Sequence, residues 1–300
     1  MVLKFFIGGL PRSGTTMVQN ILDSHPNIYG GSEFDRIPNI IDLRKKLLAT
    51  LGFGRITEYT SKDQIDKAIK NLILDLFNGI ESEKDIQIIS EKTPWNILFF
   101  EELYELFPDA KFVMVLRNPL HVLNSMKQVA INAKANGVQP PDFTTNYLVA
   151  VAYMEQVYRL MTRLLKNHPN SFYLIKYENL LVDLKKESVF LCDFLNISWN
   201  PKLLEFNSIS HPGEKTMTKD GIWYTKDKFK EDPKLKKTKN SSSNLTYLEE
   251  SFVKYIFGNN QLVKGYLKKN SLAGRLISKI IYQKYKMYYR FKSIPKRLLD

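Results

Sequence analysis

A glycine-containing loop near the start of the chain constrains the fold most strongly. In the segment FFIGGLPRSGTTMVQNILDSHPNIYGG, residues 5–31, an apolar run ends at Gly8-Gly9 and a polar loop leads into a helix-like pattern. The spacing from Gly9 to Thr16 matches the phosphate-binding loop G-x-x-x-x-G-K-[ST], except that Thr15 replaces the lysine. A strand, such a loop and a helix in succession predict an α/β protein that binds a phosphate group at the loop.

The rest of the chain alternates between short apolar runs and longer helical spacings. The expected strands cover 3–7, 86–91, 111–116 and 172–176, and the expected helices cover 15–24, 36–50, 63–78, 94–106, 119–133, 144–167 and 185–195. This alternation predicts an α/β fold with a parallel sheet flanked by helices. Residues 207–244 lose the periodicity, which indicates a long loop. We expect a single domain over residues 1–300.

Positive charge is concentrated near the C-terminus. The net charge is +13, and the segment from Lys264 to Leu299 holds eleven Lys or Arg residues and no acid. Aromatic residues alternate with cations in a tail at about 274–300, which fits a basic helix packed on the domain or a segment on an anionic membrane surface. Cys192 alone cannot form an internal disulfide, and no stretch reaches membrane-spanning length. The expected location is therefore the cytoplasm, with peripheral attachment to a membrane as an added property.

Basic residues occupy equivalent places at three strand-to-helix junctions. Arg12 lies in the turn after the first strand, Lys92 precedes the helix over 94–106, and Arg117 ends the strand before the helix over 119–133. In a parallel sheet these junctions align along the carboxyl edge, where ligands bind. Each helix start also offers free backbone N–H groups to an anion. Three cations at such positions indicate a ligand with more than one phosphate-like group.

The missing lysine narrows the kind of nucleotide site. In ATP- and GTP-hydrolysing loops the lysine neutralises phosphates, and an acid at the end of another strand helps to hold magnesium. Here the strand ends carry Lys92 and Arg117, which predicts a multiply anionic nucleotide bound without a metal. A metal-dependent nucleotide kinase is the alternative, with Asp109 as its weak metal-holding candidate. Nucleic-acid binding is not expected to be the main function, because it leaves the three junctions unexplained.

Three motifs resemble those of sulfotransferases that use 3′-phosphoadenosine 5′-phosphosulfate (PAPS). They are PRSGTT at 11–16, EKTP at 91–94, and LRNP at 116–119 followed by Ser125. The motif order is most similar to that of tyrosylprotein sulfotransferases, which also have counterparts of LDSHPNIYGGSEFDRIP at 22–38 and YENL at 177–180. The resemblance covers about residues 3–200 and implies a P-loop-like sulfotransferase fold.

The resemblance also implies roles for individual residues. Glu33 falls at the position of the catalytic base, Lys92 at that of the group that stabilises the leaving phosphate, and Arg12 acts beside them. The implied nucleotide-binding residues are Pro11, Arg12, Ser13, Gly14, Thr15 and Thr16 for the 5′-phosphosulfate, Arg117 and Ser125 for the 3′-phosphate, and Tyr177 along the nucleotide. No metal is expected. Arg117 and Ser125 are about two helical turns apart, so both can face one phosphate.

The acceptor is less well defined, because the chain departs from the animal enzymes near the base. Those enzymes have an arginine two places after the base, where this chain has Asp35, and Arg36 follows one place later. Their disulfide cysteines are absent. A peptide tyrosine and a carbohydrate hydroxyl therefore both remain candidates, with tyrosine slightly favoured by motif order. Lysines within 207–244 could supply positive charge for an acidic peptide; they are Lys215, Lys219, Lys226, Lys228 and Lys230.

Overall fold

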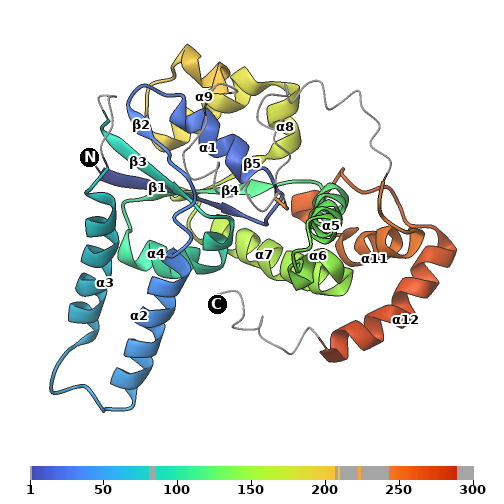
Figure 1. Ribbon diagram of the computed structural model, residues 1–300, viewed down its shortest axis with the longest axis horizontal. Coiled ribbons are helices and arrows are strands. Elements are labelled where there is room, and N and C mark those ends of the chain that lie inside the picture. The colour runs from blue at the N-terminus through green and yellow to red at the C-terminus, as the bar shows by residue number, and fades with distance from the viewer. Residues whose placement is uncertain (1, 81–85, 207–208, 210–221, 224–242, 289–300) are drawn as a thin grey trace.

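One parallel sheet organises the molecule (Figure 1). The structure is a computed structural model that describes residues 2–80, 86–206, 209, 222–223 and 243–288. Within this part of the chain, five strands form a sheet of order β2-β3-β1-β4-β5, and all neighbouring strands are parallel. The strands are β1 (Val2–Gly9), β2 (Ile28–Tyr29), β3 (Ile88–Lys92), β4 (Lys111–Leu116) and β5 (Phe172–Lys176). The predicted fold class is thereby confirmed.

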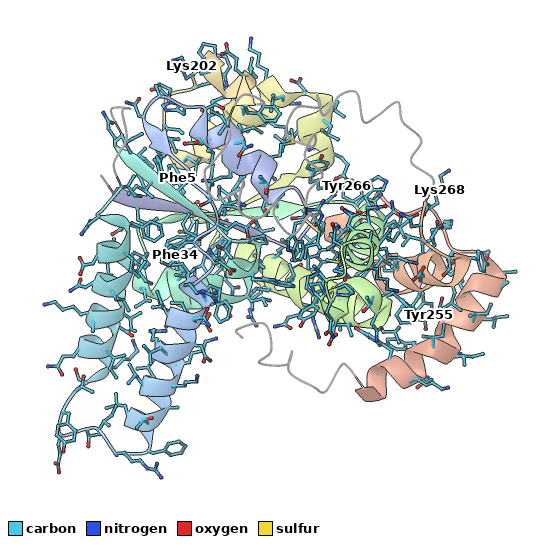
Figure 2. The ribbon with its side chains drawn as sticks, viewed as in Figure 1. Phe5, Phe34, Lys202, Tyr255, Tyr266 and Lys268 are labelled. Carbon is cyan, nitrogen blue, oxygen red and sulfur yellow. The ribbon has the colours of Figure 1, made fainter. Side chains whose placement is uncertain are left out.

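Helices cover both faces of the sheet. Those outside the C-terminal region are α1 (Thr15–Asp23), α2 (Ile37–Gly52), α3 (Lys62–Phe77), η1 (Pro94–Phe99), α4 (Phe100–Leu106), α5 (Pro119–Ala135), α6 (Asp142–Thr145), α7 (Tyr147–Asn167), α8 (Tyr177–Val182), α9 (Leu184–Leu195) and η2 (Pro201–Leu204). Alternate residues of β1 enter different layers. Phe5 packs with the cluster that includes residues of α1 and α9 (Figure 2), and Phe6 belongs to the other cluster, on the opposite side of the sheet. Central strands buried on both faces explain the continuous apolar runs in the sequence.

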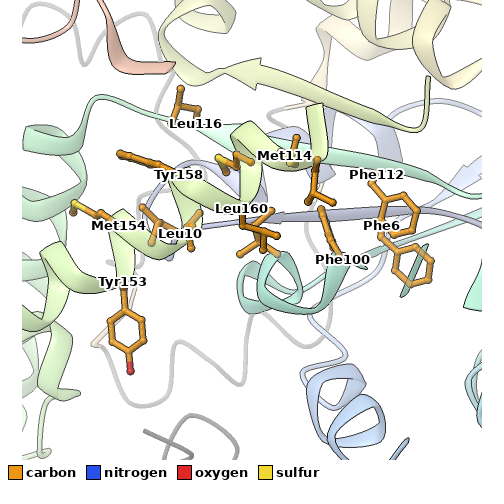
Figure 3. Packing of buried hydrophobic residues seen from close by; sticks show 14 of the residues in the cluster. Phe6, Leu10, Phe100, Phe112, Met114, Leu116, Tyr153, Met154, Tyr158 and Leu160 are labelled. Atoms are coloured by element: carbon orange, nitrogen blue, oxygen red, sulfur yellow. The ribbon is translucent and has the colours of Figure 1, made fainter. Parts of the chain in front are cut away.

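Aromatic rings fill the layer on the Phe6 side (Figure 3). Phe112 of β4 stacks on Phe172 of β5 with ring centroids 4.8 Å apart, and Phe6 lies 5.4 Å from Phe112 on its other side. Phe100 of α4 meets Phe112 edge to face at 5.1 Å. Such offset and edge-to-face pairs add to the burial energy of the rings. The three middle strands are thus held rigidly, and so are the junctions at their ends.

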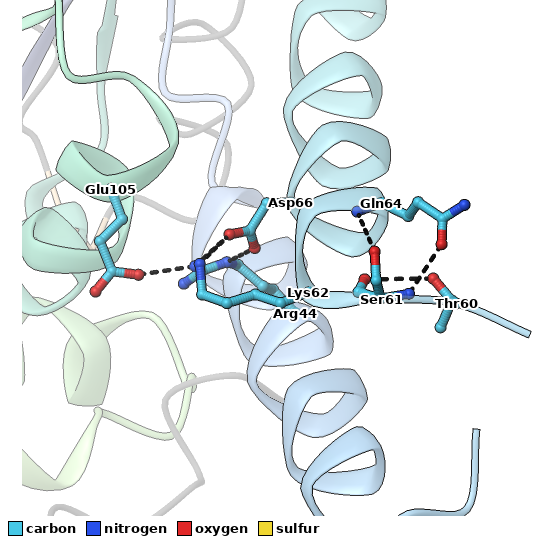
Figure 4. Close-up of polar contacts among 7 residues, drawn as sticks. All are labelled: Arg44, Thr60, Ser61, Lys62, Gln64, Asp66 and Glu105. Atoms are coloured by element: carbon cyan, nitrogen blue, oxygen red, sulfur yellow. Dashed lines mark hydrogen bonds and ion pairs between the residues drawn. The ribbon is translucent and has the colours of Figure 1, made fainter. Parts of the chain in front are cut away.

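A buried arginine attaches the α2–α3 hairpin to the sheet layer (Figure 4). Arg44 of α2 is only 2% exposed. Its Nε donates to Asp66 Oδ1 of α3 at 2.6 Å, and its Nη2 donates to Glu105 Oε2 of α4 at 2.7 Å. A guanidinium can satisfy two carboxylates at once because its donors lie in a planar fork. Three helices therefore meet at one side chain.

Residues 243–288 of the C-terminal region form the helices α11 (Tyr247–Phe257) and α12 (Leu272–Tyr288), with the 3₁₀ turn η5 (Gln261–Val263) between them. The inner face of α12 is packed: Ser278 and Tyr285 are buried, and the Tyr285 ring lies 5.5 Å from that of Phe252. The first half of the expected tail at 274–300 is therefore a helix packed on the domain, as one of the two sequence interpretations had it. Among the described residues, no helix combines the length and apolar character needed to cross a membrane.

The structure differs from the sequence prediction in several elements, and one predicted loop lies mostly outside the described residues. The short strand β2 was not expected, because two residues give no periodic signal. The helix predicted over 94–106 begins as the 3₁₀ turn η1 and becomes α-helical only at Phe100. Most of the predicted 207–244 loop, including the five lysines named above, lies outside the described residues, whereas Ile222 and Trp223 are described and packed.

Candidate active site

The three basic junctions meet at one edge of the sheet. In the sheet order β3 and β4 flank β1, and the register pairs Ile7 with Lys92 and Gly9 with Val115. The loops that follow these strands therefore leave the sheet side by side. Arg12, Lys92 and Arg117, which the sequence placed at separate junctions, converge on one place.

The loop after β1 has the backbone of a phosphate cradle. Arg12 (φ 75°) and Gly14 (φ 103°) both lie in the left-handed region. A Cβ on Gly14 would stand 2.3 Å from Cδ2 of Tyr177, so a side chain is excluded by contact as well as by conformation. Helix α1 begins at the next residue, and no side chain caps it. Its first N–H groups thus point into the space that the loop encloses.

Two arginines are held against this loop. Arg12 Nε donates to Ser125 Oγ of α5 at 3.0 Å, and Arg12 Nη1 donates to the carbonyl of Trp223 at 2.9 Å. Arg117 Nη1 donates to the carbonyl of Arg12 at 3.0 Å, and its guanidinium lies 4.5 Å from the centre of the Tyr177 ring. Arg12, Ser125, Arg117 and Tyr177, all expected at the nucleotide, therefore form one contact network.

Two buried polar atoms at the loop have no hydrogen-bond partner among the described residues. Ser13 Oγ and Arg117 Nε are buried, and neither has a hydrogen-bond partner within the described residues. Buried polar groups in proteins are nearly always satisfied, so each such atom needs an explanation. Both lie at the loop and beside the cations, where an anionic ligand would satisfy them.

A second network joins Lys92 to the base candidate. Lys92 Nζ donates to Glu33 Oε1 at 2.6 Å and to Thr16 Oγ1 of the loop helix at 3.3 Å. The Lys92 side chain is 3% exposed and that of Glu33 is 15% exposed. Burying an ammonium group without a carboxylate partner costs free energy, so Glu33 stabilises the buried Lys92. The same contact places a carboxylate where it could act as a base. The ammonium joins the carboxylate to the phosphate loop.

The sequence did not predict a buried polar cluster next to Lys92. Glu91 is 2% exposed and accepts hydrogen bonds from Thr93 Oγ1 at 2.8 Å and from the side-chain amide of Asn96. Burial raises the pKa of Glu91 to about 7, against the hydrogen bonds from Thr93 and Asn96 and the nearby charge of Lys92, which lower it. Thr93 Oγ1 also accepts from the backbone N–H of Asp35 at 3.0 Å. The cluster thus fixes the segment that carries Glu33 to the end of β3.

Asn96 can serve either protonation state of Glu91. Its Nδ2 faces the carboxylate, while its Oδ1 is buried and has no partner among the described residues. If the amide turned by half a rotation, Oδ1 would accept a hydrogen bond from the hydroxyl of neutral Glu91. The contact between Glu91 and Asn96 depends on how the two side chains are oriented in the fold. In the sequence, Glu91 is simply a residue near the end of a predicted strand, so the contact could not be predicted.

The remaining sequence candidates fall into two groups. Pro11 and Thr15 are buried within the loop, so each predicted nucleotide-binding residue lies at this edge of the sheet. Asp109, the weak metal candidate of the kinase alternative, precedes β4 and lines a surface pocket with Leu3 and Lys4. It lies at the amino edge, opposite the loop, and cannot reach the same ligand.

The fold and the lysine-free loop define a P-loop-like α/β protein whose loop and basic side chains meet at the carboxyl edge of its sheet. The chain belongs to the sulfotransferase family, whose model matches residues 4–201. That range includes most of β1, all of β2 to β5 and each candidate site residue.

The two relatives described next are each less than 30% identical to this chain. The chain is 27% identical to protein-tyrosine sulfotransferase A of Caenorhabditis elegans over 68% of this chain and 52% of that protein. It is 28% identical to protein-tyrosine sulfotransferase 1 of Danio rerio, over 68% of this chain and 56% of that protein. The match thus spans about half the length of these relatives. Among solved structures, the sulfotransferase domain of the Synechococcus PCC 7002 olefin synthase matches with a TM-score of 0.48 and 18% identity, covering 77% of this chain and 88% of that one.

Proposed function

We propose that this protein transfers a sulfuryl group from PAPS to an acceptor hydroxyl, with Glu33 as the base. The observation that carries the proposal is the Lys92–Glu33 pair at 2.6 Å, in which the same ammonium also reaches Thr16 of the phosphate loop at 3.3 Å. A base and a cation placed together beside a phosphate cradle are what transfer from a nucleotide to a hydroxyl requires.

The residues present fit a nucleotide with phosphates at both ends. The loop from Pro11 to Thr16 and the start of α1 would hold the 5′-phosphosulfate, where Ser13 Oγ has no partner among the described residues. Arg117 and Ser125 would hold the 3′-phosphate, where Arg117 Nε has no partner in the same part of the chain. Tyr177 packs on Gly14 and on Arg117, so its ring would border the nucleotide. When bound, PAPS supplies the activated sulfuryl group.

Glu33, Lys92 and Arg12 would then remove the proton of the acceptor hydroxyl and stabilise the leaving group. The pKa of a phenol is near 10 and that of a sugar hydroxyl is higher, so a carboxylate must accept the proton as attack proceeds. Glu33 can do this because its carboxylate is held in place by the Lys92 ammonium, 2.6 Å from its Oε1. The Lys92 ammonium has three donors and can turn from Glu33 toward the leaving oxygen as negative charge grows there. Arg12, tied to Ser125 and Trp223, supplies a second positive charge at the loop.

For the acceptor we propose a tyrosine hydroxyl in a peptide. The support is the similarity to the two protein-tyrosine sulfotransferases over 68% of this chain. A carbohydrate hydroxyl is the alternative, because the same base would serve it and Asp35 stands where the animal enzymes have an arginine.

Incubation with ³⁵S-labelled PAPS, acidic tyrosine peptides and an oligosaccharide panel tests both parts. Label on a peptide tyrosine supports the proposal in full, and label found only on sugar overturns the acceptor while leaving the sulfotransferase. Calorimetry with adenosine 3′,5′-bisphosphate and with ATP, each with and without EDTA, tests the kinase alternative. Tight ATP binding that EDTA abolishes would overturn the sulfotransferase.

A further inference from the structure

Helix α12 is apolar on its outer face as well as on its inner one. The inner face packs on α11, where Tyr285 is buried and Tyr282 lies 5.7 Å from Tyr255 (Figure 2). On the other side, Leu272, Leu276 and Ile280 are 80%, 66% and 69% exposed. Residues spaced by four lie along one line of a helix, so these three form a continuous stripe. Helix α12 itself lies at the outer edge of the molecule (Figure 1).

Cations border this stripe on the same helix. Arg275 and Lys279 each precede a stripe residue by one position, so they lie about a quarter turn around the helix, and both are exposed. From residue 264 to 288 the sequence has seven Lys or Arg residues and no acid. The seven are Lys264, Lys268, Lys269, Arg275, Lys279, Lys284 and Lys286.

The acids on neighbouring helices do not cancel this charge, because they are paired elsewhere. Glu249 of α11 accepts from Lys127 of α5 at 2.8 Å, and Glu250 pairs with Lys254 at 3.2 Å. Glu155 of α7 accepts from the Tyr285 hydroxyl on the inner side of α12. Among the described residues, the positive charge of the outer face therefore has no carboxylate opposing it from the elements packed against it.

An aromatic residue extends the apolar face at its N-terminal end. Tyr247 of α11 is 58% exposed, and its hydroxyl lies 2.5 Å from Ser271 Oγ, directly before Leu272. Tyrosine is amphipathic and suits a boundary between water and an apolar phase. A helix with an apolar stripe, a cationic border and a tyrosine at its end has the features of a helix that lies in a membrane interface.

We propose that the outer face of α12, formed by Leu272, Leu276, Ile280 and the bordering Arg275 and Lys279, docks on an anionic lipid surface. Charge complementarity selects this occupant. A cationic border repels the same border on a second copy of this chain, whereas anionic headgroups attract it and acyl chains cover the stripe. The inference does not depend on the proposed reaction.

The test measures co-sedimentation of the full chain with vesicles of phosphatidylcholine alone or with about one third phosphatidylserine. One variant removes the apolar stripe without changing charge, Leu276→Gln/Ile280→Gln. A second removes border charge, Arg275→Gln/Lys279→Gln. The matched controls are Leu72→Gln/Leu76→Gln on α3, whose leucines are 41% and 48% exposed and also one turn apart, and Lys185→Gln/Lys186→Gln on α9. Thermal unfolding of each variant shows whether it folds.

We expect the wild type to bind the anionic vesicles and to be released by added salt. Each α12 variant should bind about tenfold more weakly, while both controls bind as the wild type does. Wild type that fails to bind, or α12 variants that bind as well as the controls, would overturn the proposal. So would sedimentation showing a dimer that Leu276→Gln/Ile280→Gln dissociates, because the stripe would then be covered by a second copy.

Discussion

The Lys92–Glu33 pair shows how one contact can serve both folding and chemistry. Lys92 is 3% exposed and needs a carboxylate, and Glu33 is the carboxylate placed 2.6 Å away. Truncating either side chain leaves the charge of the other one buried without its partner. Variants that preserve shape are therefore the informative ones at this site.

Glu33→Gln should abolish proton removal while leaving the nucleotide site in place. The amide oxygen can still accept from Lys92, but an amide cannot take a proton near neutral pH. Turnover should fall by roughly a hundredfold or more. Affinity for adenosine 3′,5′-bisphosphate, measured by calorimetry, should stay nearly unchanged. Glu58→Gln, at an exposed position, is the matched control, and full activity of Glu33→Gln would remove Glu33 from the base role.

Glu91 should make part of the stability depend on pH. Burial raises its pKa to about 7 from 4.5, so the folded protein holds this proton more tightly than the unfolded chain. The stabilisation is therefore full below about pH 4.5 and is lost as the pH rises through about 7. Glu91→Gln stays neutral at each pH, and Asn96 can accept from the new amide. Its free energy of unfolding should thus rise relative to the wild type over this range, by at most about 1.4 kcal/mol per pH unit.

Urea unfolding across that pH range measures this difference. Glu58→Gln, at an exposed position, is the matched control for the removal of one carboxylate. A pH-independent difference between Glu91→Gln and this control would mean that burial does not raise the pKa of Glu91.

At the scale of elements, the phosphate loop depends on two residues far apart in sequence. Gly14 adopts a left-handed conformation, and the Tyr177 ring of α8 closes the space where its Cβ would lie. The loop is thus shaped by the helix after β5 as much as by its own sequence.

Gly14→Ala should disrupt the loop through both effects. The left-handed conformation costs an alanine about 1–2 kcal/mol, and the overlap with Tyr177 must displace either the ring or the loop. Gly54→Ala isolates the first effect, because Gly54 has φ 75° and nothing within 4 Å of its Cβ position. Calorimetry should show a loss of nucleotide affinity of about tenfold or more only for Gly14→Ala. Equal affinities in the two variants would show that Tyr177 does not shape the site.

Hydrophobic patterns in the sequence predicted the buried strands, whereas contacts made by residues outside such patterns were not predicted. The strands at 86–91, 111–116 and 172–176 were found because buried parallel strands are continuous apolar runs. The cations at the junctions could be brought together in advance because strand order aligns strand ends. Trp223 was missed because its contact with Arg12 is a backbone carbonyl in a segment without periodicity. Glu91 was missed because its partners depend on how η1 turns after the strand.

At the scale of the whole molecule, the core continues beyond the region that matches the family. The family model ends at residue 201, yet the cluster that contains Phe6 and Phe112 also contains Phe252, Phe257 and Tyr285. Tyr158 of α7 meets Phe257 of α11 at 5.2 Å, and Phe252 meets Tyr285 of α12 at 5.5 Å. The C-terminal helices therefore pack as a continuation of one layer, and α12 has a structural role on its inner face and an exposed apolar stripe on its outer face.

Tyr285→Ala tests whether that inner face belongs to the cooperative core. Tyr285 is 1% exposed, so truncation removes a buried ring and leaves a cavity against Phe252, at a cost of about 3–5 kcal/mol. Tyr285→Phe removes only the hydroxyl that donates to Glu155 and should cost about 1 kcal/mol. Tyr59→Ala, at a position 81% exposed, is the control and should cost little. Denaturant unfolding should show one transition, shifted in that order, because the helix and the sheet share one core. If Tyr285→Ala unfolded at the wild-type midpoint, the inner face of α12 would not be part of the cooperatively folding core.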